Sequence, residues 1–109
     1  MSKILPGFYY HYKHDPNKDI YNYAYEVLGV GLHTEGKHDA LDPKDIFVVY
    51  RPLYEAFVFK IGKLFDLRPL EMFMENVTKE GKTFSRFKKI TDPNIIAQLD
   101  KRKREMYQE

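Results

Sequence analysis

Four short segments of the chain each place a cationic side chain beside aromatic or proline residues. They are Tyr9-Tyr10-His11-Tyr12-Lys13, Tyr50-Arg51-Pro52-Leu53-Tyr54, Leu67-Arg68-Pro69 and Ser85-Arg86-Phe87. Aromatic rings offer flat stacking surfaces, and a guanidinium group binds phosphate, carboxylate or the edge of a base through fixed N–H donors. The segments therefore predict a recognition surface for a planar or anionic ligand, and they name no reaction.

The candidate ligand-binding residues come from these segments and from the strand predicted to lie beside the first of them. Tyrosines would supply stacking surfaces, and three arginines would hold negative charge or base edges. The set is Tyr10, His11, Tyr12, Lys13, Glu26, His33, Tyr50, Arg51, Tyr54, Arg68 and Arg86. A nucleotide, a single-stranded nucleic-acid segment or another planar anion would fit such a surface.

A structural role is the alternative interpretation of the same residues. Arg51 could tie its turn to a carboxylate such as Glu26 or Glu71, and the tyrosines would then simply pack. Glu26 falls on an apolar strand face, so it needs a donor if that face is buried. Convergence of Arg51, Arg68 and Arg86 would favour an anion pocket, whereas separate ion pairs would favour the structural role.

Catalysis is a further hypothesis, because a histidine can act as an acid or a base near neutral pH. A small hydrolase or transferase acting on a nucleotide or modified base would use His11 or His33, with Glu26 orienting the ring. His11 and His14 are three residues apart, which places them on opposite faces of a strand, and no metal site is expected. The sequence contains no phosphate-binding glycine loop or dinucleotide fingerprint, so we assign no catalytic residue and no cofactor.

Length and composition indicate a single small domain. The 109 residues include 18 basic and 16 acidic side chains, a net charge of +2 that does not suggest non-specific wrapping of nucleic acid. Cysteine is absent, which excludes disulfides and fits a reducing compartment. No window approaches the roughly 20 apolar residues of a membrane span. We therefore expect a soluble cytoplasmic protein without a membrane segment.

Hydrophobic periodicity predicts a mainly β fold. Strands are expected over residues 8–13, 23–33, 46–51, 54–61, 64–68 and 83–90, with a polar loop over residues 34–45. Pro69 suits the start of a short helical turn, and Asp92 followed by Pro93 can begin a C-terminal helix. The predicted architecture is a small, strongly bent antiparallel sheet or SH3-like barrel of five to six strands. Residues 1–91 would form this domain, and residues 92–109 a helical extension.

Five ordered motifs give the chain a resemblance to a known family. They are Gly7-Phe8-Tyr9-Tyr10-His11-Tyr12-Lys13, Tyr25-Glu26-Val27-Leu28-Gly29-Val30, Val48-Val49-Tyr50-Arg51-Pro52-Leu53-Tyr54, Leu67-Arg68-Pro69-Leu70-Glu71-Met72-Phe73 and Arg86-Phe87. Over roughly residues 7 to 90 the chain resembles the small bacterial family catalogued as domain of unknown function 1653. The resemblance implies a compact β-rich fold of SH3-like barrel type and no established activity, substrate or cofactor.

Two parts of the chain depart from the family pattern. The stretch Glu55 to Asp66 is longer than the usual turn and contains the apolar segment Phe57-Val58-Phe59, and the tail after Thr91 exceeds the usual domain. An apolar ribbon and an amphipathic helix would each lose water on association. The second functional hypothesis is therefore a protein-interaction module or a homodimer.

Overall fold

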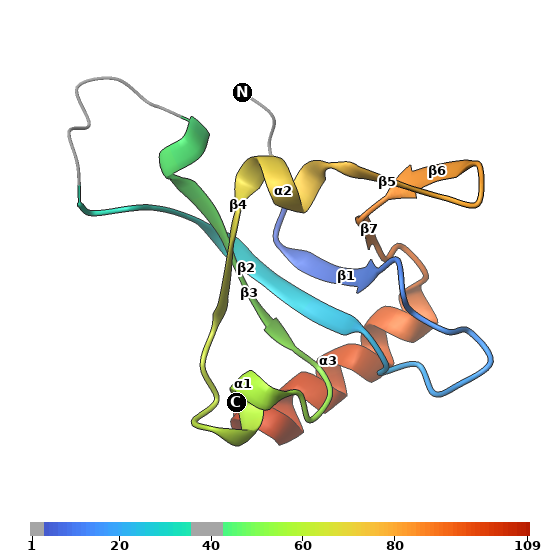
Figure 1. The fold of residues 1–109 in the computed structure, drawn as a ribbon. Helices are drawn as coiled ribbons and strands as arrows, with labels where there is room; N and C mark the ends of the chain where they lie inside the picture. Colours follow the sequence, from blue (N-terminus) through green and yellow to red (C-terminus); the bar gives the residue numbers. More distant parts are fainter. Residues whose placement is uncertain (1–3, 36–42) are drawn as a thin grey trace.

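The computed structural model describes residues 4–35 and 43–109, and its centre is a five-stranded antiparallel sheet (Figure 1). The strands lie in the order β4-β3-β2-β1-β7, and a separate hairpin pairs β5 with β6. Their bounds are β1 Gly7–His11, β2 Ala24–Leu32, β3 Ile46–Pro52, β4 Asp66–Pro69, β5 Asn76–Lys79, β6 Lys82–Ser85 and β7 Phe87–Lys89.

The predicted mainly β fold is confirmed in its bent-sheet form. In the part of the chain that the structure describes, β4 and β7 form the two edges of the main sheet and do not pair with each other, so no barrel closes. The predicted loop over residues 34–45 ends in a short 3₁₀ helix, η1 (Pro43–Asp45), and its residues 36–42 lie outside the described residues.

The central pairing joins β2 to β3, and it explains the bend of the sheet. Val27 pairs with Tyr50, but Gly29 pairs with Val49, so the register shifts between Val27 and Gly29. An extra residue on one strand bends that strand and increases its twist. Gly29 therefore marks the bend of β2.

The C-terminal helix α3 (Pro93–Tyr107) covers one face of the sheet, which we call the α3 face. The side chain of Asp92 accepts hydrogen bonds from the backbone N–H groups of Asn94 (2.8 Å) and Ile95 (3.4 Å), so the predicted cap is present. Leu99 is fully buried against this face, and burying such a side chain contributes about 1.5 to 3 kcal/mol. No helix among residues 4–35 and 43–109 is long and apolar enough to cross a membrane.

The short helix α2 (Leu70–Met74) packs against the opposite face, which we call the tyrosine face. The ring of Phe73 stacks on Phe87, with 4.1 Å between centroids, and meets Tyr9 and Tyr50 edge-on. The helix predicted after Pro69 is therefore confirmed as α2. The helix α2 covers one end of the tyrosine face.

The strand predicted over residues 54–61 is wrong, because residues Phe57–Lys60 form a short helix, α1. Its alternating aromatic residues resemble a strand, but β4 already pairs with β3 along the position that a further strand would need. The chain instead reverses through α1 and a turn in which Lys63 takes a positive φ of 53°. No residue of α1 is buried.

The strand predicted over residues 83–90 is two strands, and β5 has no counterpart in the prediction. β6 pairs with β5, whereas β7 pairs with β1, and the chain changes partner at Arg86. The Glu80-Gly81 pair, with φ of 52° and 77°, makes the tight turn between β5 and β6. The alternating pattern continues through Arg86, so periodicity alone does not reveal the break.

Candidate functional site

Arg51 lies on the α3 face and pairs there with two carboxylates. Its Nε donates to Glu26 at 2.8 Å, and its Nη2 donates to both carboxylate oxygens of Glu109 at 2.9 Å. The guanidinium also lies 4.0 Å from the ring centroid of Tyr107, and the side chain is 7% exposed. This arginine has the ion-pair arrangement that the structural interpretation describes.

Glu26 is held from two sides, which satisfies the need for a donor seen in the sequence. Besides Arg51, Lys103 of α3 approaches its second oxygen at 3.2 Å. Burial by itself lowers the pKa of Arg51, but the hydrogen bonds to Glu109 and Glu26 outweigh it and raise that pKa overall. The network joins β2, β3 and α3, so Glu26 and Arg51 hold the helix on the sheet.

Arg68 lies on the tyrosine face and keeps free donors. It pairs with Val48 across the β3–β4 ladder, and Asp66 pairs with Tyr50, so all four side chains share this face. The Nε of Arg68 donates to the hydroxyl of Tyr50 at 3.1 Å, and its guanidinium lies 5.6 Å from the ring centroid of Phe87. Within the described residues, its two terminal nitrogens form no hydrogen bond.

Arg86 approaches the same region from the bend between β6 and β7. One terminal nitrogen pairs with Glu75, and its buried Nε is the one buried side-chain polar atom without a partner in the described part of the chain. The charge of Arg86 acts on both His11 and Tyr50. Arg68 and Arg86 therefore converge on the tyrosine face, whereas Arg51 does not join them.

His11 stands between these two arginines and is a neutral donor. Its Nδ1 accepts a hydrogen bond from the backbone N–H of Lys13 at 3.1 Å, so the ring proton is on Nε2. Burial, followed by the charges of Arg68, Lys13 and Arg86, lowers the pKa of His11 from 6.5 to about 4. Near neutral pH the imidazole is therefore uncharged, and its Nε2–H can donate to a ligand.

The tyrosines form the floor of this face. Tyr25 and Tyr54 share a hydrogen bond between their hydroxyls, and Tyr25 also contacts Tyr50 edge-on at 5.4 Å. Burial raises the pKa of all three phenols above their ordinary value, so they remain protonated at physiological pH. Tyr54 and Tyr23 are partly exposed and offer ring surface at the open end of the face.

Asp66 is the acidic member of this group, and the sequence interpretation did not include it. Its side chain is partly buried, and it forms no hydrogen bond or ion pair with any residue that the structure describes. Burial raises the pKa of Asp66, although the charge of Arg68 opposes that rise. Its position two residues before Arg68 on a predicted strand was the signal that could have identified it, because alternate residues share a face.

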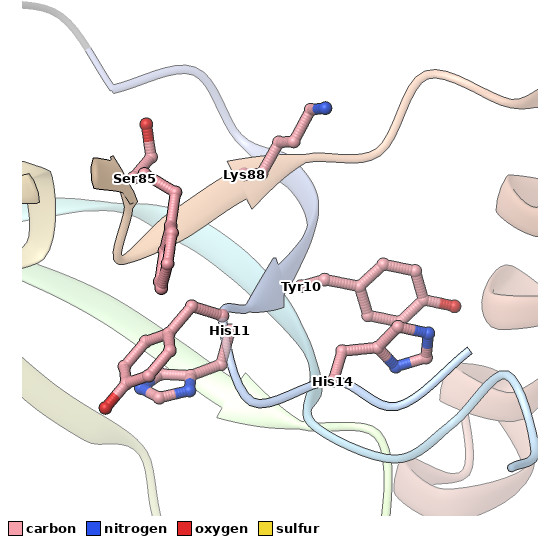
Figure 2. A pocket seen from close by; sticks show the side chains of 7 residues that line it. Tyr10, His11, His14, Ser85 and Lys88 are labelled. Atoms are coloured by element: carbon pink, nitrogen blue, oxygen red, sulfur yellow. The ribbon is translucent and has the colours of Figure 1, made fainter. Parts of the chain in front are cut away.

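A pocket of about 550 Å³ adjoins the tyrosine face at His11 (Figure 2). It is lined by Tyr10, His11, Tyr12, His14, Phe84, Ser85 and Lys88. Tyr10 and His14 stack at 3.6 Å on one side, and Lys88 extends from β7 on another. The described lining therefore offers cationic and aromatic groups without a carboxylate, and His14, Phe84, Ser85 and Lys88 are members that the sequence interpretation missed.

Three further residues of the predicted ligand-binding set are Tyr10, Tyr12 and Lys13. Tyr10 donates its hydroxyl to the carbonyl of Ile20 at 2.6 Å. Tyr12 packs against Phe84 at 5.5 Å. Lys13 is exposed next to His11. Tyr10 and Tyr12 therefore line the pocket, whereas Lys13 is not part of its described lining.

His33 lies away from the site, and the acid–base arrangement with Glu26 does not form. The Nδ1 of His33 contacts the carbonyl of Glu35 at 2.9 Å, at the exposed end of β2. Glu26 lies on the α3 face, whereas His11 lies on the tyrosine face and contacts Phe87. Among the residues that the structure describes, no group of three or more acidic, histidine or cysteine side chains could hold a metal ion.

The strands and the tyrosines and arginines of the tyrosine face lie within residues 7–89, the part of the chain that matches a family model. A family described as protein of unknown function (DUF1653) matches residues 7–89. The chain belongs to this family. The DUF1653 match spans β1 to β7, so it includes the tyrosine face and the pocket but not α3. No match is found among curated proteins or among solved structures.

Proposed function

We propose that this DUF1653 protein is a non-enzymatic binding module whose tyrosine face and adjoining pocket hold a planar anionic ligand. The observation that carries the proposal is the convergence of Arg68 and Arg86 on a neutral His11, with donors of both arginines unpaired in the part of the chain that the structure describes. The terminal nitrogens of Arg68 have no hydrogen-bond partner among the described residues, and a ligand oxygen would supply one. Arg51 on the other face shows what the same residue type does when its role is structural.

The aromatic floor limits the class of anion. Tyr25, Tyr50 and Tyr54 surround the donors, and the partly exposed rings of Tyr54 and Tyr23 can stack against a flat group. Stacking of a base on an aromatic side chain contributes roughly 1 to 3 kcal/mol. A nucleotide or a single-stranded nucleic acid combines such a base with phosphate, so either fits better than a small inorganic anion. Binding of modest affinity that weakens with salt is expected.

A salt titration tests this proposal. Fluorescent mononucleotides and short single-stranded oligomers would be titrated with the protein at several salt concentrations. We expect binding at low ionic strength that declines as salt rises, because salt screens the contacts to phosphate. Absence of binding to every probe at low ionic strength would contradict the proposal.

Two arginine variants identify the binding face. Arg68→Gln removes free donors from the tyrosine face, and we expect it to weaken binding about tenfold or more. The matched control is Arg104→Gln, which removes the same charge from an exposed position on α3 where Arg104 pairs with Asp100. Equal affinities for the two variants would assign any binding to overall charge and exclude this face.

Self-association is a second candidate function, and an exposed apolar surface favours it. This surface, the α1 patch, comprises Phe57, Ile61, Leu64, Phe65 and Leu67, with exposed fractions of 73, 53, 51, 51 and 64%. Its members run along the chain from α1 to Leu67 of β4, which is an edge strand of the sheet. An edge strand can pair with the same strand of a second copy around a two-fold axis, and this would bury the patch on both chains.

Sedimentation velocity distinguishes this candidate from a monomeric binding module. We expect a dimer whose dissociation constant increases when Leu67→Lys places a charge on the edge strand. Leu32→Lys, a similarly exposed position at the far end of β2, is the control. A monomer at high micromolar concentration would exclude self-association through the α1 patch.

A further inference from the structure

Asp66 is an unusual residue in a site for anions. It lies on the tyrosine face, partly buried, and no described residue donates a hydrogen bond to it. A carboxylate at this position repels a ligand that carries only negative charge and oxygen acceptors. The ligand must therefore bring N–H donors to Asp66 as well as acceptors to the arginines.

We propose that the ligand carries a guanine base, with Asp66 accepting from its N–H groups and Arg68 or His11 donating to its carbonyl oxygen. This inference rests on the proposed function, since it specifies what the same face binds. Asp66 and Arg68 are two residues apart on β4, so their backbone positions are about 7 Å apart on one face. The charges of both side chains act on the hydroxyl of Tyr50, so the two groups end near the same point of the tyrosine face.

The distribution of donors and acceptors distinguishes guanine from the other purine. Guanine presents two adjacent N–H donors on its pairing edge, and a carboxylate accepts both in a bidentate arrangement that is stronger than a neutral contact. Its carbonyl oxygen beside them accepts from a guanidinium or from the Nε2–H of His11. Adenine places an acceptor nitrogen next to its amino group, so Asp66 would meet one donor and one repelling lone pair.

The charged groups near Asp66 are consistent with this arrangement. The charge of Arg68 acts to lower the pKa of Asp66. The charge of Asp66 in turn contributes to the raised pKa values of Tyr25, Tyr50 and Tyr54. The pocket beyond His11 contains Lys88 and Ser85, whose positive charge and hydroxyl suit the phosphate of the same nucleotide. The base and the phosphate would then occupy the two sides of His11.

Isothermal titration with GMP and AMP tests the inference on the whole chain. We expect GMP to bind at least tenfold more tightly than AMP, which is the usual discrimination of one good bidentate contact. Asp66→Asn keeps the size of the side chain but replaces one acceptor oxygen with a donor amide. In this variant the preference for GMP should fall to less than threefold, because the affinity for GMP falls while the affinity for AMP rises as an amide replaces the carboxylate that repels the adenine nitrogen.

The outcomes separate this inference from the proposed function. Equal affinities for GMP and AMP, or an unchanged preference in Asp66→Asn, overturn the guanine assignment and leave a general binding module. Absence of binding to both nucleotides and to the single-stranded oligomers at low ionic strength removes the proposed function itself. Thermal unfolding of Asp66→Asn within 3 °C of the original protein shows that a lost preference reflects recognition and not misfolding.

The same guanine chemistry could come from a free nucleotide or from a single strand. RNA pentamers with one central guanine, compared with pentamers in which adenine replaces it, distinguish these sources. Binding of the guanine pentamer at least tenfold more tightly than GMP assigns the site to single strands, and the reverse order assigns it to free nucleotides. Equal affinities for the guanine pentamer and the adenine pentamer argue against the inference.

Discussion

The two faces of the sheet use arginine in opposite ways. On the α3 face, Arg51 forms ion pairs with Glu26 and Glu109, and its guanidinium lies over the ring of Tyr107. Lys103 also pairs with Glu26. On the tyrosine face, Arg68 forms one hydrogen bond to a neutral hydroxyl, and its two terminal nitrogens have no hydrogen-bond partner among the described residues. The sequence contexts of both arginines are similar, since each is followed by proline.

The difference teaches that an arginine-proline motif does not by itself indicate a binding site. What decides is whether a carboxylate from another element reaches the guanidinium. For Arg51 that carboxylate comes from the neighbouring strand and from the last residue of the chain, so local sequence shows only part of it. The comparison predicts that the α3 face controls stability, whereas the tyrosine face controls binding.

The largest expected effect is the loss of stability caused by Arg51→Met. The change removes the charge from a buried network and leaves Glu26 with Lys103 alone. Removal of one partner of a buried pair typically costs about 3 to 5 kcal/mol. Urea unfolding monitored by circular dichroism should show a loss at or somewhat below this range, because Lys103 still compensates Glu26.

Arg68→Met is the matched change on the tyrosine face. It should lower the free energy of unfolding by about 1 kcal/mol or less, since it removes one hydrogen bond at a partly exposed position. A cost for Arg68→Met equal to that for Arg51→Met would mean that both arginines are structural. The contrast between the two faces would then be wrong.

The strands that positioned the site were predictable because period-two alternation decided which side chains share a face. Glu26 is an example: its place among apolar residues indicated a buried carboxylate with a donor, and Arg51 is that donor. The helix at Phe57–Lys60 was not predictable in the same way. Its alternating aromatic residues favour a strand. The pairing of β3 with β4, however, already occupies the position beside β3 that such a strand would take.

The site itself was only partly predictable for a related reason. Which arginines meet depends on the order of strands in the sheet and on where α3 ends, and neither follows from local patterns. Glu109 reaches Arg51 from 58 positions along the chain. Asp66 was missed because a single carboxylate has no distinctive spacing, although its shared face with Arg68 follows from the predicted strand over residues 64–68.

A smaller effect is expected from protonation of His11. The pKa of this ring is about 4 in the folded chain against 6.5 for an unperturbed histidine. The unfolded chain therefore takes up a proton at a higher pH than the folded chain does. Stability should fall as the pH decreases from about 6.5 to 4, and the contribution is on the order of 1 kcal/mol once solvent screening of a partly exposed ring is considered.

His11→Gln isolates this contribution. The difference in unfolding free energy between the variant and the original protein should shift in favour of the variant between pH 7 and pH 4.5, because glutamine does not titrate. The matched control is His33→Gln, which replaces an exposed ring beyond the far end of β2. Parallel curves for the original protein and His11→Gln would show that burial and the neighbouring cations do not lower the pKa of His11 in the folded chain.

The smallest change in stability, with a gain in binding, is expected from Glu75→Gln. Glu75 pairs with Arg86 at a largely exposed position, and such pairs contribute about 0 to 1 kcal/mol. The variant frees a terminal nitrogen of Arg86 for a ligand and removes a negative charge near the site, so nucleotide affinity should rise about two- to threefold. Glu105→Gln changes the same charge on exposed α3 and should leave affinity unchanged. If Glu75→Gln weakens binding instead, Glu75 positions Arg86 for the ligand, and Arg86 then resembles Arg51 more closely than Arg68.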